Sequence, residues 1–465
     1  MKPFRLAAAL LALLSGCSFA PEYRRPAAPV PAAWPEAAQA PSPPAVEVPE
    51  ARDLSWREVL PDPRLQRVIE MALENNRDLR LAALNVERTR GIYGIQRGEI
   101  YPALGAHAEA NRLRRSEDLL QYGQPRTITQ YSADLGVTAW EIDLFGRIRS
   151  LSEQALEEFL AAAEVRRGVE LALVAETAQV FLALVADRER LALAEATLAT
   201  QQAVYGLVNR RWEVGLSSAI DRKRAELPVE TARVEAARLT QLVAQGKNAL
   251  DLLAGAPVPP EWVPGRLADL APPREVAPGI PSEVLLRRPD VAAAEHRLKG
   301  AYASIGAARA ALFPRISLTT LVGTASDELS RLFASGTGTW LFRPQAALPI
   351  FDSRLWAALR VSQTEREIVL AQYEKAIQTA FREVADTLAV RRTIFEQLDA
   401  QRALLAAAAE TYRLARQRYE QGIDSFLGVL DAERTLFAAE QGLVALRQVE
   451  LASRIRLYAA LGGAE

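Results

Sequence analysis

The sequence predicts an α+β membrane protein in which long α-helical hairpins continue into a transmembrane β-barrel. Three observations lead to this prediction: an internal repeat, two long stretches of helix-forming residues, and four short segments in which apolar and polar residues alternate. Because bacterial barrels need about eight strands or more, several copies of the chain are expected to share one barrel.

The chain consists of two similar halves. Residues 205–226 (YGLVNRRWEVGLSSAIDRKRAE) align with residues 412–433 (YRLARQRYEQGIDSFLGVLDAE). Self-similarity at a fixed offset indicates a duplicated supersecondary unit. We therefore expect a first structural repeat at 55–256, a proline-rich connector at 257–281 and a second repeat at 282–465. The identical pairs include Tyr205/Tyr412, Arg211/Arg418, Glu213/Glu420, Gly215/Gly422, Ser218/Ser425, Ala225/Ala432 and Glu226/Glu433.

Residues 1–16 have the pattern of a secretory signal peptide. Lys2 and Arg5 precede an apolar run at 6–14, which is too short to remain in a bilayer as a spanning helix. Residues 14–17 (LSGC) look like a bacterial lipobox, which implies cleavage before Cys17 and acylation of its thiol. Cys17 is the only cysteine, which excludes a disulfide framework and a thiolate metal site. An ordinary signal peptide with an incidental cysteine is the alternative.

A lipid anchor and an extended tether are expected at 17–54. The stretch from Pro21 to Pro49 is rich in proline and alanine, and such a stretch forms neither helices nor sheet ladders. Ser18, rather than an acidic residue, follows the cysteine. By resemblance to bacterial lipoproteins, this favours the outer membrane.

Two stretches predict unusually long helices. Residues 147–214 contain no proline, residues 353–421 contain neither proline nor glycine, and good helix formers dominate both. At about 1.5 Å per residue, each stretch makes a helix on the order of 100 Å long. Each is followed by a glycine and capping residues, so we expect helical hairpins at 146–254 and 352–461.

The hairpin tips are expected at two equivalent turns. Gly215 and Gly422 would supply the left-handed conformation that ends a helix. Ser218 and Asp221 have the spacing of a capping box at the start of the returning helix. The N-cap oxygens are expected from Ser217 or Ser218 at the first tip, and from Asp424 or Ser425 at the second.

The second long stretch also has the period of a coiled coil, because its candidate seam residues alternate steps of three and four. Three of these positions are arginines, and the pattern leaves open whether Arg391, Arg402 and Arg416 face a lumen or a subunit seam. A solvated face of a simple long hairpin is the alternative. The seam residues are Phe381, Val384, Leu388, Arg391, Phe395, Leu398, Arg402, Leu405, Ala409, Tyr412, Arg416 and Tyr419.

Two β-strands are expected at about 101–145 and two more at about 313–351. Alternation with a period of two is typical of strands in a membrane barrel, although a half-buried soluble hairpin would look similar. The residues expected on the apolar face are Leu104, Ala106, Ala108, Ala110, Tyr131, Ala133, Leu135, Val137, Ala139, Ile316, Leu318, Thr320, Val322, Trp340, Phe342, Ala346 and Leu348.

Four strands leave two open edges, and unpaired backbone groups are costly in lipid. Three copies of the chain would give twelve strands, but the counting also allows a dimer or a tetramer.

Several function classes lack support in the sequence. The net charge is −1, which gives no electrostatic basis for binding nucleic acid. The two histidines, His107 and His296, have no second ligand at metal spacing, and the sequence contains no phosphate-binding glycine loop and no nucleophile elbow. The sequence therefore predicts neither an enzyme nor a cofactor, apart from a covalent lipid on Cys17.

The motifs together resemble the TolC-type outer-membrane channels, in particular the lipoprotein branch that serves resistance-nodulation-division efflux pumps. The resemblance covers essentially the whole mature chain. Its carriers are Cys17 with Pro21-Glu22-Tyr23, Trp56, Asp62-Pro63-Arg64-Leu65, residues 72–79 (ALENNRDL), residues 140–147 (WEIDLFGR), Arg288-Pro289-Asp290-Val291, Leu348-Pro349-Ile350-Phe351, and Gly422 with Leu430-Asp431-Ala432.

This resemblance implies a homotrimer in which a twelve-stranded outer-membrane barrel continues into a periplasmic α-barrel. It also implies a passive exit duct for drugs or other small molecules, whose partners are a periplasmic membrane-fusion adaptor and an inner-membrane pump. A duct for type I protein secretion or for metal efflux remains an alternative, as does a periplasmic coiled-coil scaffold lipoprotein.

The resemblance also implies a periplasmic gate near the second tip. Asp431 matches an acidic residue that lines the constriction, Arg434 follows it, and Leu427 matches an apolar plug. Tyr419 and Asp221 match a pair that latches neighbouring hairpins. A helix-surface pair between Asp431 and Arg434 is the plain alternative to a gate role. One departure is Gly428, which stands where the best-known member has a second acidic residue.

In this family the hairpin tips dock the adaptor. The matching residues here are Gly215, Leu216, Ser217, Ser218, Gly422, Ile423, Asp424 and Ser425.

Overall fold

The computed structural model describes residues 19–35, 54–278 and 285–463. The expected signal peptide and Cys17 lie outside the described residues. The chain forms two compact units, and each takes segments from both halves of the sequence. The sheet unit contains residues up to 27, 85–163 and 293–373, and the hairpin unit contains 28–84, 164–292 and residues from 374 onward.

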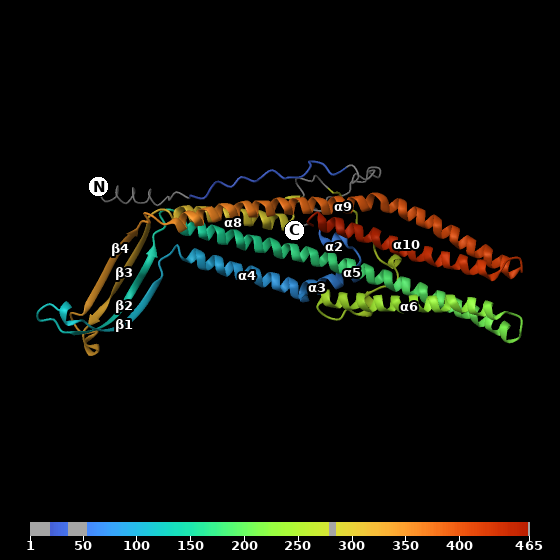
Figure 1. Cartoon of the computed structure of the whole chain (residues 1–465), viewed down its shortest axis with the longest axis horizontal. Helices are drawn as coiled ribbons and strands as arrows, with labels where there is room; N and C mark the ends of the chain where they lie inside the picture. Colours follow the sequence, from blue (N-terminus) through green and yellow to red (C-terminus); the bar gives the residue numbers. More distant parts are fainter. Residues whose placement is uncertain (1–18, 36–53, 279–284, 464–465) are drawn as a thin grey trace. The chain divides into compact units, whose positions relative to one another are not determined.

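The sheet unit contains one four-stranded antiparallel sheet in the order β1-β2-β3-β4 (Figure 1). Its strands are β1 (Leu104–Arg114), β2 (Thr127–Glu141), β3 (Arg315–Ser326) and β4 (Gly338–Ala347). The β2–β3 pairing joins the two halves of the sequence. Short 3-10 turns, η3 (Glu117–Leu119) and η6 (Leu329–Arg331), lie in the loops within each β-hairpin.

The register of the sheet confirms the predicted faces. Leu104 lies opposite Val137, which lies opposite Thr320, which in turn lies opposite Phe342. Two residues along, the row is Ala106, Leu135, Val322 and Trp340. The alternate positions are mostly polar or glycine, such as His107 opposite Asp134. One face of the sheet is therefore apolar across all four strands, as the alternation predicted.

The register of β2 shifts once, between Val137 and Trp140. Ala139 has a positive φ of 53° at this bulge, and the indole nitrogen of Trp140 donates a hydrogen bond to the Ile100 carbonyl (3.2 Å). The extra residue returns Trp140 to the apolar face, where it lies opposite Leu318. The prediction that Ala139 lies on this face was therefore wrong, because Trp140 takes that place.

The turn from β2 into the following helix and the turn that leads into β3 share one cluster of charged residues. Glu141 at the end of β2 is buried, and its carboxylate accepts hydrogen bonds from Arg147 Nε (2.9 Å) and Nη2 (2.8 Å). Arg315, at the start of β3, forms an ion pair with the same carboxylate (2.5 Å). Residues from both halves therefore meet at Glu141, which explains the acidic residue and the following arginine in the motif at 140–147.

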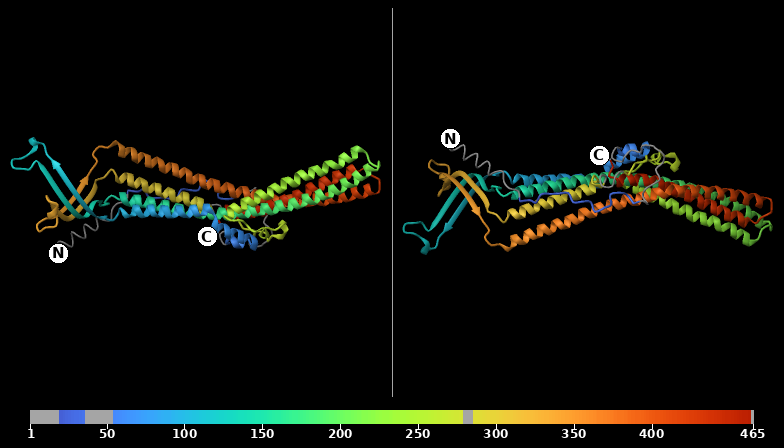
Figure 2. Two further views of the ribbon diagram at one scale, coloured as in Figure 1. Left: turned by 90° about the horizontal axis from the view of Figure 1, so that it is seen from below. Right: turned by 90° about the horizontal axis from the view of Figure 1, so that it is seen from above.

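The expected helical hairpins are present (Figures 1 and 2). In the first, α5 (Arg147–Glu213) turns into α6 (Ala219–Ala254), and in the second, α9 (Ser353–Glu420) turns into α10 (Phe426–Ala460). The shorter helices are α2 (Trp56–Val59), α3 (Pro63–Asn75), α4 (Arg77–Gly98) and α8 (Pro289–Ala310).

The middle of α5 is the most apolar helical segment in the described part of the chain. An 18-residue window in it could cross a membrane by length and composition, but 56% of that window is buried inside the structure. Core helices pass the same test, and here the buried side chains pack within the hairpin unit. The apolar ones are Leu173, Val174, Ala175, Ala178, Phe181, Leu182, Leu184, Val185 and Ala186, and Thr177 is buried among them.

The corner between α3 and α4 explains two of the sequence motifs. Asp62 is buried and caps α3 by accepting hydrogen bonds from the Arg64 and Leu65 backbone N–H groups (2.9 and 3.3 Å). The Asn76 side chain accepts hydrogen bonds from the first amides of α4 and donates one to the Leu253 carbonyl of α6 (3.0 Å). Gly255 ends α6 with a φ of 69°.

The described part of the proline-rich connector packs against the hairpin unit. Val258, Val263 and Val276 are buried. The Leu267 amide donates to Glu189 Oε2 of α5 (2.8 Å). The connector therefore adds to the core of this unit.

The tether also makes specific contacts. Residues 19–35 contain no helix or strand, as expected from their proline content. In the hairpin unit, however, Trp34 is buried and stacks on Phe381 of α9, with ring centroids 5.0 Å apart.

The coiled-coil seam predicted along α9 is only partly correct. Val384 and Leu388 are buried as expected, but Phe395 is 50% exposed. Ile394 takes its place and packs against Leu443 of α10. Leu398 and Leu405, further along the predicted seam, pack in the same cluster, so the departure is local to Phe395.

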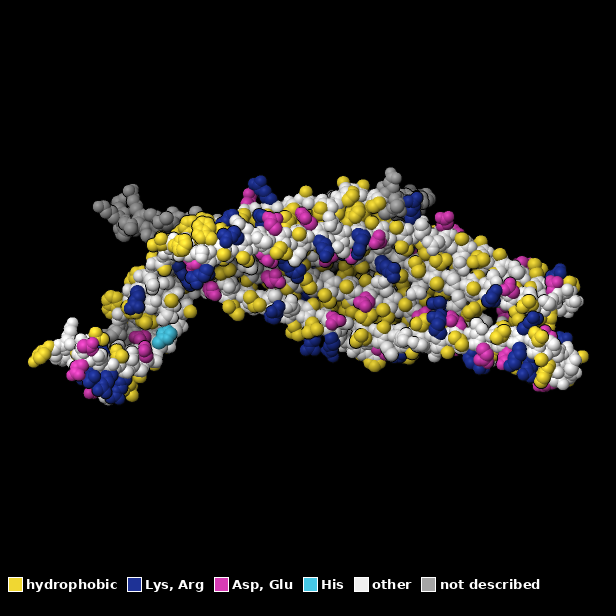
Figure 3. All heavy atoms as spheres, in the orientation of Figure 1, with side chains coloured by type: hydrophobic (Ala, Val, Ile, Leu, Met, Phe, Trp, Pro, Cys, Tyr) yellow, Lys and Arg dark blue, Asp and Glu magenta, His cyan; other side chains and the backbone are white. Residues whose placement is uncertain are grey.

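The three seam arginines have different surroundings. Arg391 has a side chain that is 15% exposed, and its Nη2 lies 3.3 Å from Glu275 Oε1 in the connector. Arg402 and Arg416 pair with acidic residues of the same helix at exposed positions. Figure 3 shows basic and acidic side chains interspersed along the helices on the face in view.

Candidate functional site

The first hairpin tip has the geometry that its sequence predicts. Gly215 has a φ of 76°, and the next amide, of Leu216, donates to the Arg211 carbonyl (2.7 Å). Ser218 is the N-cap of α6: its hydroxyl accepts from the Asp221 amide (3.0 Å), and the Asp221 carboxylate accepts from the Ser218 amide (3.3 Å). The expected capping box is confirmed. The hydrogen bonds from the Ser218 hydroxyl and backbone lower the pKa of Asp221.

The second tip has no side-chain cap on its returning helix. Gly422 has a φ of 74°, and the Ile423 amide donates to the Arg418 carbonyl (3.0 Å). Ser425 stands at the N-cap of α10, but its side chain makes no capping hydrogen bond. Asp424 does not cap the helix either, because its carboxylate accepts two hydrogen bonds from Arg418, at Nε (2.5 Å) and Nη2 (3.1 Å). The expected N-cap oxygen at this tip was wrong, since a two-point bond with a guanidinium is stronger than a single capping bond.

Both tips expose apolar side chains. Leu216 is 71% exposed and Ile423 is 58% exposed. They occupy equivalent positions in the two halves, each directly after the left-handed glycine.

The structure brings the expected latch residues together. Asp221, Tyr419 and Leu427 line one hollow of about 290 Å³ between the two tips. The Tyr419 ring packs against Phe426, with centroids 5.1 Å apart. The remaining residues lining this hollow are Val208, Arg211, Leu216, Ser217, Arg224, Ser425 and Leu430.

Asp431 and Arg434 form an ion pair within one chain. Arg434 Nη2 lies 2.6 Å from Asp431 Oδ1, and the two side chains are 81% and 66% exposed. At that exposure the pair contributes little to stability. Both residues line a second hollow, of about 360 Å³, together with Leu427, Arg224 and other residues of α5, α6 and α10.

Arg224 lines both hollows, but it was not predicted from the sequence as a site residue. The repeat alignment could have found it, because it aligns Arg224 with Asp431. The same alignment puts Asp221 opposite Gly428. The first half of each chain thus carries an acidic residue and then a basic one where the second half carries glycine and Asp431.

Glu433 is a second residue that the sequence analysis missed as a site residue. It is 9% exposed on α10, and it borders the hollow that contains Asp431. Burial raises the pKa of Glu433, and a hydrogen bond with Gln201 of α5 and the charge of Arg416 only partly oppose this. Its spacing from the buried residue Val429 could have placed it on the inward face of the helix.

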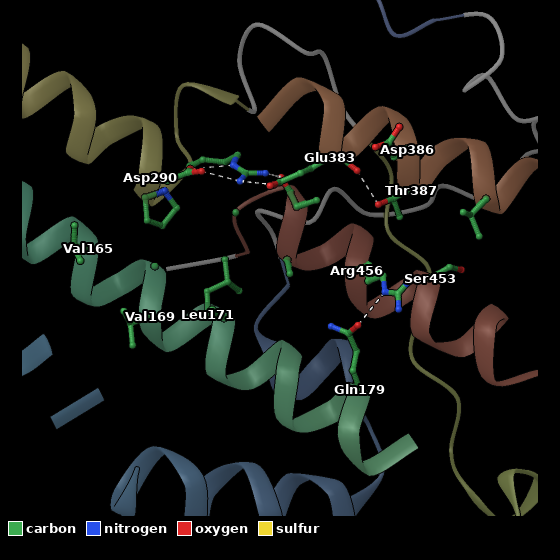
Figure 4. Close-up of a pocket in the computed structure, with 18 residues that line it drawn as sticks. Val165, Val169, Leu171, Gln179, Asp290, Glu383, Asp386, Thr387, Ser453 and Arg456 are labelled. Atoms are coloured by element: carbon green, nitrogen blue, oxygen red, sulfur yellow. Dashed lines mark hydrogen bonds and ion pairs between the residues drawn. The ribbon is translucent and has the colours of Figure 1, made fainter. Parts of the chain in front are cut away.

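A further cavity in the hairpin unit, of about 680 Å³, is built around Arg288 (Figure 4). The Arg288 guanidinium donates to Asp290 Oδ2 and to Glu383 Oε2 (both 2.8 Å), and to the Ala460 carbonyl at the end of α10 (2.7 Å). Burial opposes the charge of Arg288, but its bonds with Asp290 and Glu383 outweigh burial and raise its pKa. This cluster joins α8, α9 and α10, which explains the Arg288-Pro289-Asp290 motif.

Neither histidine lies in a metal-binding cluster. His296 Nδ1 lies 2.6 Å from Glu157 Oε2 of α5. Over the residues that the structure describes, no group of three or more His, Cys, Asp or Glu side chains could hold a metal ion.

Comparison with known proteins places the chain among outer-membrane proteins. A family model described as outer membrane efflux protein matches residues 68–256 and 280–463. The toluene efflux pump outer membrane protein TtgC of Pseudomonas putida is 47% identical over 452 residues, which cover 97% of this chain and 93% of the relative. The antibiotic efflux pump outer membrane protein ArpC of Pseudomonas putida has the same identity and coverage. The crystal structure of the open state of the outer membrane channel MtrE of Neisseria gonorrhoeae is 36% identical, with a TM-score of 0.86, covering 96% of this chain and 98% of that one.

Proposed function

The chain belongs to the outer membrane efflux protein family, and from this membership we propose that three copies of it form a passive exit duct of a tripartite efflux pump. The sheet is the observation that supports this most directly. Its apolar face runs across all four strands, and within the described residues β1 and β4 each pair on one side only. Three such sheets, joined edge to edge, make a twelve-stranded barrel without open edges.

A periplasmic coiled-coil scaffold does not require a four-stranded sheet with an apolar face. We therefore set the scaffold hypothesis aside in favour of the duct. The direct test is single-channel recording of the purified protein in planar bilayers, with native mass spectrometry of the same sample. We expect a trimer that conducts ions. A stable monomer or dimer, or a trimer without conductance, would contradict the proposal.

The cargo we propose is drugs and small apolar molecules. Support comes from the relatives, whose names assign them to toluene and antibiotic efflux. In a host that lacks its own outer-membrane efflux channel but has a matching pump, the chain should restore growth in the presence of toluene or an antibiotic. Restored secretion of a protein, or restored metal resistance alone, would favour one of the alternative ducts.

The adaptor is proposed to dock on the hairpin tips. The exposed side chains of Leu216 and Ile423, held on well-formed turns, support this assignment. Changing either residue to glutamate should abolish efflux but leave the trimer intact. Tyr122, a fully exposed aromatic residue in the β1–β2 loop, provides the control, because Tyr122→Glu makes the same kind of change away from the tips. Loss of the trimer in the tip variants would count against docking.

Asp431 is proposed to line the periplasmic gate. Three copies around an axis would bring like charges close together, and acidic rings favour cations. Within one chain Asp431 pairs with Arg434, so its charge is partly balanced and the ring would be weaker than one of isolated carboxylates.

Charge reversal separates a gate role from a plain surface pair. Asp431→Arg should shift the channel from cation toward anion selectivity in bilayer recordings. Asp399→Arg is the matched control, because Asp399 forms the same type of exposed pair with Arg402 (2.9 Å) on α9. Equal selectivity in the two variants would leave Asp431 as a surface residue.

The lipid attachment at Cys17 is a separate proposal, supported by the lipobox-like pattern and by the absence of any other cysteine in the sequence. Radiolabelled palmitate should enter the wild-type protein and not the Cys17→Ala variant. Incorporation that survives the substitution would refute it.

A further inference from the structure

Residues 19–25 lie against α8 in the sheet unit, where Figure 1 shows them as a blue segment. The Phe19 ring stacks on Phe313 with centroids 4.5 Å apart, and Phe313 in turn stacks on Phe145 at 5.1 Å. The Phe19 carbonyl accepts a hydrogen bond from Arg309 Nη1 (3.0 Å). Phe145 follows β2 and Phe313 precedes β3. This ring stack therefore lies at the β2–α5 turn and the α8–β3 turn, which connect the sheet to helices.

A buried carboxylate on α8 holds the other end of this segment. Glu295, with a side chain 7% exposed, accepts hydrogen bonds from the Tyr23 hydroxyl (2.9 Å) and from Arg25 Nε (2.9 Å) and Nη2 (3.0 Å). Burial is the largest influence on Glu295 and favours its neutral form, but the bonds from Arg25 and Tyr23 outweigh burial and lower the pKa. The only other cation near this carboxylate among the described residues is Lys299, at 3.9 Å. Without Tyr23 and Arg25, α8 would bury a poorly paired charge.

The direction of the side chains alternates along the segment. Phe19, Tyr23 and Arg25 face the protein, whereas Glu22 and Arg24 pair with each other in solvent, with side chains 76% and 84% exposed. If the segment made no specific contacts, its side chains would not be sorted in this way. The alternation therefore indicates that the segment is bound.

A glycine on α8 leaves room for the segment to pass. A Cβ added to Gly306 would lie 2.8 Å from the Cβ and the backbone nitrogen of Ala20, and also 2.8 Å from Ser150 Oγ of α5. The backbone of the segment therefore leaves no room for a side chain at this position. A Cβ on Gly300, on the same helix, would meet its nearest neighbour, Glu157 Cβ, at an ordinary 3.5 Å. Both glycines are buried and both lie next to α5, but only a Cβ on Gly306 would also meet the segment.

We propose that residues 19–25 form an intramolecular clamp, which binds the surface formed by Glu295, Gly306 and Phe313. The clamp holds the N-terminal segment at the turns between sheet and helices without help from a lipid. The consequence for membrane anchoring rests on the proposed lipidation of Cys17. Two residues span at most about 7 Å, so a lipid on Cys17 would be attached close to these turns.

Limited trypsin digestion of the full-length detergent-extracted protein tests the clamp. The cleavage site to follow by mass spectrometry is the peptide bond between Arg24 and Arg25, which the protease reaches only when the segment leaves α8. We expect slow cleavage in the wild type, and cleavage faster by about tenfold or more in Glu295→Gln and in Gly306→Ala, because proteolysis follows the population of the open form.

Gly300→Ala is the matched control and should be cleaved like the wild type. It makes the same chemical change on the same helix without meeting the segment. Cleavage sites within α5 and α9 report on folding and should remain protected in every variant. Rapid cleavage of the wild type, or equal acceleration in Gly300→Ala and Gly306→Ala, would overturn the clamp.

The Cys17→Ala variant separates the clamp from the lipid. If palmitate labelling is lost and the Arg24–Arg25 bond stays protected, the clamp works without the lipid, as proposed. If labelling persists in Cys17→Ala, the lipid assignment fails, but protection still supports the clamp. If labelling and protection are lost together, the segment depends on the lipid, and the inference is wrong.

Discussion

Replacing Arg288 with methionine should loosen one local region of the hairpin unit. The Arg288 side chain is 10% exposed, and it makes four hydrogen bonds: two to Asp290 (3.0 and 2.8 Å), one to Glu383 (2.8 Å) and one to the Ala460 carbonyl (2.7 Å). Methionine keeps much of the volume but removes every donor. The ends of α8 and α10 would then lose their common partner.

The size of the effect follows from the exposure of the partners. Breaking a fully buried ion pair costs about 3–5 kcal/mol. Here the Asp290 and Glu383 side chains are 49% and 43% exposed, so water replaces part of what they lose. We therefore expect a local loss of about 2–3 kcal/mol, mostly from the buried guanidinium and its bond to the Ala460 carbonyl. This loss corresponds to an increase of about 30- to 150-fold in the population of the opened form.

Hydrogen exchange followed by mass spectrometry measures this opening directly. Peptides that cover the start of α8 and the end of α10 should exchange faster by that factor, and peptides from the hairpin tips should not change. Arg287→Met provides the matched control, since Arg287 is the adjacent arginine and is exposed. The reasoning fails if the two variants exchange alike, or if Arg288→Met accelerates exchange equally throughout the protein.

Three further predictions concern the tip and the corner of the hairpin unit. Gly422→Ala forces a left-handed alanine and should destabilise the second tip by about 1 kcal/mol. Gly428→Ala, in the first turn of α10 with open space around it, should instead stabilise α10 slightly, by about 0.5 kcal/mol at most. Opposite shifts in hydrogen exchange at the tip would verify this, and equal shifts would contradict it. Gly255→Ala should reduce thermal stability more than Gly422→Ala, because the added Cβ would also lie 2.7 Å from the Asn75 carbonyl oxygen. A smaller loss of thermal stability in Gly255→Ala than in Gly422→Ala would contradict this. The packing around Glu433 should be most stable below the ordinary pKa of a glutamate and should weaken as pH rises through the raised pKa of Glu433, because the packed state favours the neutral acid. Hydrogen exchange at α10 should therefore depend on pH, and Glu433→Gln should abolish this dependence. If the pH dependence persists in Glu433→Gln, Glu433 is not its cause.

The elements of the fold could be predicted from the sequence because their signals are local. The absence of proline indicated two long helices, and the glycine turns marked their ends: α5 and α9 end within a residue or two of the predicted turns. The alternation of small apolar and polar residues predicted the faces of the sheet as far as the bulge in β2, since each residue of a regular strand points opposite to its neighbour. It failed at Ala139, because the bulge was not predicted. A left-handed glycine marks both tips, because no other residue adopts that conformation as easily.

Contacts between distant segments could not be predicted in the same way. Asp424 looked like a helix cap, but Arg418 lies close enough to bind it instead. Phe395 fitted the seam by spacing, yet the partner helix meets Ile394. The proline-rich segment at 19–35 looked like an unattached tether, because nothing in its composition shows that Glu295 and Phe381 offer it partners. In each case the partner residue lies on another helix or on the other side of the hairpin turn, where local sequence patterns do not show it.

The pairing of β2 with β3 has a consequence for how the protein is made. These two strands are separated along the chain by all of α5, α6, the connector and α8. A chain that crosses the inner membrane from its N-terminus delivers the β1–β2 hairpin long before β3 arrives, and until then the outer edge of β2 can pair with other chains. Closing such a long loop is slow, so the helical hairpins, whose contacts are local, should form first. The newly exported protein therefore passes through a stage in which its membrane strands are unfinished and need protection from aggregation.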